Sequence, residues 1–140
     1  MSEIKNAAPG KARPQFRNIG VLQIARYSLP LPGKISILHR ISGAAMFLLL
    51  PWVLYVFDQS VSSEISFEVF KAVVASPCAK LILLGLIWAY LHHFCAGIRY
   101  LLLDLHIGID KVAARQSAAV VLAVSLPLTV LCGLKLFGVF

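Results

Sequence analysis

Three stretches of the chain contain no Lys, Arg, Asp or Glu, and each is long enough to cross a lipid bilayer. They cover residues 41–57, 81–98 and 116–134, and are 17, 18 and 19 residues long. A membrane-spanning helix needs about 20 mainly apolar residues, with a range of about 17–25. The pattern therefore predicts an all-α membrane protein with three transmembrane helices.

The residues that flank these stretches set the expected helix ends. We expect a transmembrane domain over 35–140, with helices over about 35–58, 77–105 and 116–137. Pro77 suits a first helical turn, where no backbone donor is lost. Pro51 and Pro127 fall inside expected helices, which membrane helices tolerate.

Residues 1–34 form a polar arm that holds four of the seven prolines and six of the thirteen basic residues. We expect an irregular arm with a short turn at the membrane surface over 17–27. The connection 106–115 carries two bases and the loop 59–76 only one. The positive-inside rule therefore places the arm and the second connection in the cytoplasm.

The first loop contains a possible amphipathic turn over 63–75 that would lie at the membrane interface. Three cysteines, Cys78, Cys95 and Cys132, form no C-x-x-C pattern, and we expect buried free thiols.

Composition narrows the class of protein further. Of the 140 residues, 59% are hydrophobic and 14% are charged, whereas a soluble domain is about 25% charged. This excludes an ordinary soluble enzyme and a disordered chain. The net charge of +7 does not indicate nucleic-acid binding, because the bases gather in the arm and no basic stripe is interleaved with exposed aromatic residues.

Ionisable residues in or beside membrane spans are costly and usually mark a function. The first span leaves the cytoplasm and the second returns to it. Ser36, His39 and Arg40 are therefore expected at the same depth as Arg99 and Asp104. The alternative is that the two arginines extend to lipid headgroups.

Spacing along each helix predicts which of these side chains share a face. Ser36 and Arg40 are an i, i+4 pair that offers a hydroxyl and a guanidinium to a carbonyl or an anion. On the second helix, His93, Gly97 and Tyr100 form one stripe that continues to Asp104. Gly97 would let a flat, bulky ligand lie close to the backbone beside His93.

His92 and His93 lie deep in the second span, where a neutral imidazole is a good ligand for haem iron. Adjacent helical positions point about 100° apart, so only one of the two can face a given ligand. His39 and His106 lie nearer the cytoplasmic end, so a second axial histidine would come from another chain. The alternative is a pair of histidines bonded to backbone or to neighbouring helices.

Two segments carry a family resemblance. Residues 36–43 (SILHRISG) resemble the S-x-x-H-R-x-[ST]-G motif of the cytochrome b membrane-anchor subunits of succinate dehydrogenase, respiratory complex II. Residues 93–104 (HFCAGIRYLLLD) resemble the H-x-x-x-G-x-R-H-x-x-x-D motif of that family, with Tyr100 where the family often has histidine. Arg13-Pro14 matches an R-P near the family's N-terminus.

The resemblance implies one half of a heterodimeric haem-binding bundle in the bacterial inner membrane, with the N-terminus in the cytoplasm. Such a subunit belongs to succinate:quinone oxidoreductase but does not contain the succinate site. Haem b would be shared with a second membrane-anchor subunit, and ubiquinone would be reduced with electrons from an iron–sulfur subunit and a flavoprotein subunit.

The resemblance also implies roles for individual residues. His93 corresponds to the axial haem ligand, and Ser36 and Arg40 correspond to quinone-pocket residues. Asp104 is a candidate for a proton path. The candidates for contacts to the haem propionates are His39, Arg40, Arg99 and Tyr100.

Two other functions remain open from the sequence. One is a haem-free structural anchor for a soluble oxidoreductase. The other is a small proton-conducting protein with a relay of His92, His93, Arg99 and Asp104. Succinate oxidation is not expected in this chain, which has neither a dinucleotide-binding fingerprint nor a cysteine cluster for iron–sulfur ligation.

Overall fold

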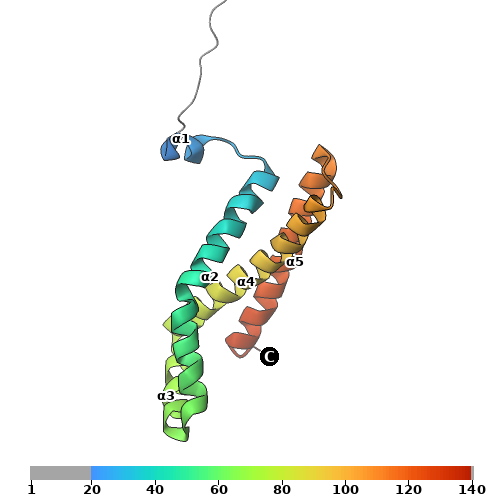
Figure 1. Cartoon of the computed structure of the whole chain (residues 1–140). Helices are drawn as coiled ribbons and strands as arrows, with labels where there is room; N and C mark the ends of the chain where they lie inside the picture. Colours follow the sequence, from blue (N-terminus) through green and yellow to red (C-terminus); the bar gives the residue numbers. More distant parts are fainter. Residues whose placement is uncertain (1–19, 140) are drawn as a thin grey trace, which may run out of the picture.

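The computed structural model describes residues 20–139, and all regular secondary structure in that range is α-helical (Figure 1). The first 19 residues of the arm, including Arg13-Pro14, lie outside the described residues. The helices are α1 (Val21–Arg26), α2 (Leu31–Ser62), α3 (Glu64–Ala75), α4 (Pro77–Asp104) and α5 (Lys111–Leu136). Of these, α2, α4 and α5 are long and apolar enough to cross a membrane, which confirms the predicted three spans.

α2 is longer than predicted at both ends. It begins at Leu31 rather than near residue 35, after Pro30 at the N-cap and with Pro32 in the first turn. Proline is favoured in a first turn because its missing N–H would have no helical partner there. The helix passes through Pro51 and ends at Ser62, four residues beyond the predicted 58. Because α2 begins at Leu31, the last four residues of the predicted arm belong to this helix.

α5 begins five residues before the predicted 116. Oδ1 of Asp110 accepts hydrogen bonds from the backbone N–H groups of Val112 and Ala113, each at 3.0 Å. This N-cap satisfies donors that have no partner within the helix. Lys111 and Arg115 therefore lie in the first turns of α5. The prediction left them outside the helix because it started the helix at the first residue of the uncharged run.

The predicted turn over 63–75 is a full helix, α3, of 12 residues. Ser63 and Ser66 form a reciprocal capping box at its start, which explains the sharp break after α2. Within the predicted turn over 17–27, the six residues Val21–Arg26 form the short helix α1.

α4 packs against both α2 and α5 and crosses between them in Figure 1. Many of the buried residues are small, which lets membrane helices approach closely. They include Ala89 and Ala96 on α4, Ser42 on α2, and Ala118 and Gly133 on α5.

Few large side chains are buried in this small bundle. Ile35 of α2 packs with Ala96 of α4 and with Ala118 and Val121 of α5. Most apolar side chains of α2 face outward, as expected for a surface in contact with lipid or another chain. The expectation of buried cysteines was wrong for Cys78 and Cys132, which are free but exposed, while Cys95 is half-buried.

Candidate functional site

His93 on α4 is held by the backbone of α2. Its Nδ1 atom lies 3.0 Å from the carbonyl oxygen of His39. A carbonyl oxygen only accepts hydrogen bonds, so the proton of the neutral ring lies on Nδ1. Nε2 then keeps a free lone pair, and it has no hydrogen-bond partner among residues 20–139. This is the form of histidine that binds a metal through Nε2.

Two small residues of α2 complete the support for the His93 ring. The hydroxyl of Ser42, which is 1% exposed, donates to the carbonyl of His39 at 2.9 Å and lies 3.3 Å from Nδ1 of His93. A Cβ atom at Gly43 would lie only 2.8 Å from Cε1 of His93. Sequence reasoning assigned no role to Ser42 or Gly43, although both lie inside the 36–43 motif.

The imidazole of His39 stacks on that of His93, with ring centroids 4.0 Å apart and planes inclined by 12°. The ring of Tyr100 lies 5.1 Å from the His39 ring. A Cβ atom at Gly97 would lie 3.9 Å from Nε2 of His39. The predicted stripe of α4 therefore faces α2. The space beside Gly97, where we expected a flat ligand, lies next to the His39 ring.

Ser36 and Arg40 lie one turn apart on α2, as expected. Ser36 is half-buried and Arg40 is exposed. Neither side chain makes a hydrogen bond within the part of the chain that the structure describes. Both polar groups thus have unused donors. Asp104 is exposed at the last residue of α4.

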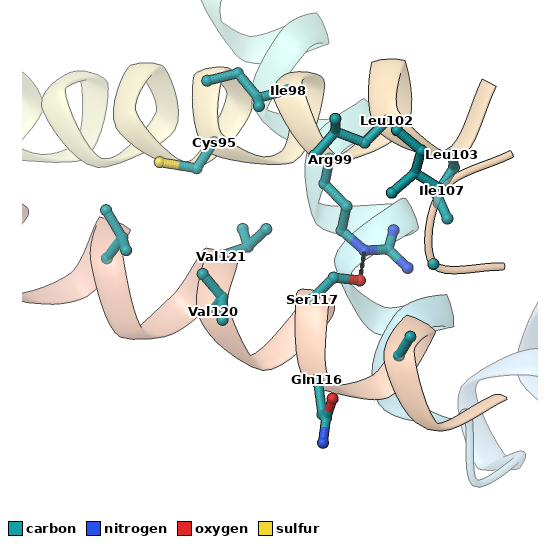
Figure 2. Close-up of a pocket in the computed structure, with 13 residues that line it drawn as sticks. Cys95, Ile98, Arg99, Leu102, Leu103, Ile107, Gln116, Ser117, Val120 and Val121 are labelled. Atoms are coloured by element: carbon teal, nitrogen blue, oxygen red, sulfur yellow. Dashed lines mark hydrogen bonds between the residues drawn. The ribbon is translucent and has the colours of Figure 1, made fainter. Parts of the chain in front are cut away.

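Arg99 points to α5 rather than to the His39–His93 pair. Its Nε donates to the hydroxyl of Ser117 at 3.0 Å (Figure 2). Nη2 donates to the carbonyl of Ala114 at 3.3 Å. The guanidinium also lies 5.3 Å from the centroid of the Tyr100 ring. Six residues along a helix correspond to a rotation of about 120°, which separates Arg99 from the face of His93.

His92 occupies a different environment from its neighbour. It is fully buried, and its ring lies 5.3 Å from that of Trp88. Neither ring nitrogen has a hydrogen-bond partner in residues 20–139. Of the adjacent pair, only His93 combines an orienting backbone bond with a free Nε2.

Comparison with known proteins supports the resemblance of the two motifs. The family model for the succinate dehydrogenase/fumarate reductase transmembrane subunit matches residues 11–132. The succinate dehydrogenase cytochrome b556 subunit of Paracoccus denitrificans is 36% identical over 117 residues, which cover 81% of this chain and 87% of that protein.

Two further relatives carry the same description. The cytochrome b556 subunit of Coxiella burnetii (strain RSA 493 / Nine Mile phase I) is 33% identical over 80% of this chain and 90% of its own length. That of Rickettsia felis (strain ATCC VR-1525 / URRWXCal2) is 30% identical over 75% of this chain and 82% of its own length. This chain, with its three apolar spans, therefore belongs to the family of transmembrane subunits of succinate dehydrogenase and fumarate reductase.

Proposed function

We propose that this membrane-anchor subunit of succinate dehydrogenase binds haem b together with a second anchor subunit and forms part of the site of ubiquinone reduction. The observation that carries the proposal is the bond from Nδ1 of His93 to the carbonyl of His39, which leaves Nε2 free. The relatives named cytochrome b556 subunits support the haem.

His93 is the proposed axial ligand. A backbone carbonyl that accepts from Nδ1 orients the ring and increases the basicity of the other nitrogen. The His39 ring lies against the face of His93 and not opposite its Nε2, so His39 does not supply the second axial ligand. We therefore assign that ligand to the second anchor subunit. A bound haem supplies one-electron transfer and can exchange electrons with the iron–sulfur subunit and quinone.

The proposed propionate contacts are His39, Arg40 and Tyr100. Tyr100 fits this role because its hydroxyl is buried and has no hydrogen-bond partner among the described residues 20–139. A buried hydroxyl without a partner is costly, and a carboxylate would accept a hydrogen bond from it. Arg40 adds an exposed cation next to His39. The sequence also suggested Arg99, but its guanidinium faces α5.

Ser36 and Arg40 are the proposed quinone contacts. Reduction of a quinone takes two electrons and two protons, so its carbonyl oxygens need hydrogen-bond donors and a route to water. The hydroxyl of Ser36 and the guanidinium of Arg40 are donors without partners in the described part of the chain. Asp104, exposed at the end of α4, is proposed as a carboxylate on the proton path.

The proposed location is the bacterial inner membrane, with the N-terminus in the cytoplasm. The excess of bases in the arm over residues 1–34 supports this orientation. The iron–sulfur and flavoprotein subunits would dock on the cytoplasmic face of the domain formed by residues 35–140.

The test is to purify the assembled complex through a tag on this chain, identify the co-purifying chains by mass spectrometry and measure haem as the pyridine haemochrome. We expect His93→Ala to lose the low-spin haem spectrum. His92→Phe is the matched control and should retain it, because His92 is enclosed beside Trp88. An unchanged spectrum in His93→Ala, or an assembled complex without haem, would contradict the proposal.

A further inference from the structure

A second site lies on another face of α4, away from the His39–His93 pair. A groove of about 510 Å³ runs between α4 and α5 (Figure 2). This volume is within the range of about 300–1,000 Å³ that is typical of ligand sites. Its lining extends along α5 from Ala113 to Val124, about 16 Å of helix at 1.5 Å per residue.

The charged and polar side chains of the groove lie in the half nearer the connection, and the deeper half is apolar. Arg99, Gln116 and Ser117 line the half nearer the connection between the two helices, together with apolar residues such as Leu103 and Ile107. Cys95 and Val124 line the opposite end, deeper in the span. The groove thus offers one cation in its outer half and hydrocarbon alone in its deeper half.

Arg99 in the outer half is a buried cation without a counter-ion in residues 20–139. It is 6% exposed, and no carboxylate of the described chain lies within ion-pair distance. Nε and Nη2 bond to Ser117 and Ala114, whereas Nη1 has no acceptor there. A buried charge without a counter-ion is unfavourable even when it is hydrogen-bonded, so this arrangement favours binding of an anion.

The groove is also open to the surroundings of the protein. Three apolar residues on its walls, Ile98, Leu102 and Val120, are 46%, 44% and 58% exposed. In a transmembrane helix such a surface contacts lipid, so an amphiphile from the bilayer can enter from the side. A small water-soluble anion would make no contact with the apolar part of the groove.

We infer that this groove binds an anionic phospholipid, with the phosphate at Arg99 and an acyl chain along the apolar walls of α4 and α5. The guanidinium binds phosphate through planar, charge-assisted hydrogen bonds. Lys111, exposed at the first residue of α5, adds positive charge on the side of the connection, whereas Arg115 is exposed and does not line the groove. Asp104 and Asp110 oppose this charge, but Asp110 is bonded to the N-terminus of α5.

The experiment uses the assembled complex, purified in detergent through a tag on this chain and depleted of lipid by washing. Phosphatidylglycerol and phosphatidylcholine with identical acyl chains are added, and binding is measured by native mass spectrometry. We expect phosphatidylglycerol to bind one site about tenfold more tightly, because the choline ammonium of the other lipid offsets the phosphate charge that Arg99 attracts. Inorganic phosphate at the same concentration should not compete, because it cannot fill the apolar groove.

Substitutions distinguish specific lipid binding in the groove from non-specific electrostatic attraction to the basic surface. Arg99→Gln should abolish the preference for the anionic lipid, and Arg99→Lys should retain part of it. Arg115→Gln removes an exposed cation outside the groove and should leave the preference unchanged. Equal loss in Arg99→Gln and Arg115→Gln would overturn the site in favour of non-specific attraction.

A third variant keeps the test valid if Arg99→Gln does not assemble. Val120→Trp fills the groove without removing a charge, and it should weaken binding of both lipids while the haem spectrum is retained. Unchanged binding of phosphatidylglycerol in Val120→Trp would contradict the inference. So would an Arg99→Gln complex with an altered haem spectrum and an unaltered lipid preference, because the guanidinium would then serve the haem.

Discussion

The carbonyl oxygen of His39 on α2 accepts a hydrogen bond from Nδ1 of His93 on α4 across 3.0 Å. This one contact links the two motifs of the sequence, which are more than 50 residues apart. It also determines which nitrogen of His93 remains free. The surrounding residues can therefore be tested for their effect on a single ring.

Replacement of Gly43 by alanine should disturb His93 without removing any functional group. The new Cβ would lie 2.8 Å from Cε1 of His93, so the ring must move. Changes in groups that orient a ligand usually reduce metal affinity about 10–100-fold. We therefore expect loss of haem or a shifted spectrum in the purified complex.

Gly85→Ala on α4 is the matched control for this substitution. A Cβ atom at Gly85 meets nothing within 4 Å, so the haem spectrum should be unchanged. Identical haem loss in both variants would point to a general effect on assembly.

Ser42→Ala should have a smaller effect than Gly43→Ala. The carbonyl of His39 still accepts from His93 when the hydroxyl of Ser42 is removed. Loss of one hydrogen bond at this 1%-exposed position should lower stability by about 1 kcal/mol. Thermal unfolding of the complex measures this change, and the haem spectrum should persist. Complete loss of haem would show that Ser42 and not the carbonyl orients the ring.

Ser36→Ala and Arg40→Gln should each lower quinone reduction by about tenfold or more, because each removes a donor worth about 1–3 kcal/mol to a developing charge. Succinate oxidation with a soluble dye as acceptor should be retained. Both activities are measured on the same purified complex.

Ser60→Ala is the control on the same helix, since Ser60 lies near the opposite end of α2 and bonds only to the carbonyl of Phe57 among the described residues. It should leave quinone reduction unchanged. Parallel loss of quinone and dye activities in Ser36→Ala would instead indicate failed assembly.

Asp110→Ala tests the cap that positions α5. It removes the acceptor for the N–H groups of Val112 and Ala113. Loss of an N-cap costs about 0.5–2 kcal/mol, so the melting temperature of the complex should fall. Asp58→Ala removes an exposed carboxylate that does not cap a helix and should have little effect. Equal melting temperatures for Asp110→Ala and the unaltered complex would argue against the cap.

The pattern of charges along the chain was sufficient to predict three membrane spans. A run of about 18 residues without charge can satisfy its backbone in lipid only as a helix, so this result depends on local composition. α4 ends at Asp104, within one residue of prediction. The early starts of α2 and α5 were missed because Pro30, Pro32 and Asp110 act through capping, which a count of charges does not detect.

Helical spacing predicted which residues share a face, but not what each face meets. It placed His93, Gly97 and Tyr100 on one stripe, and only the crossing of α2 over α4 brought the His39 carbonyl to His93 and Gly43 under its ring. The same packing turned Arg99 to Ser117 on α5. The sequence alone thus determined the helices and the order of their side chains, whereas the tertiary structure decided the partners, because contacts between helices depend on how close their backbones approach.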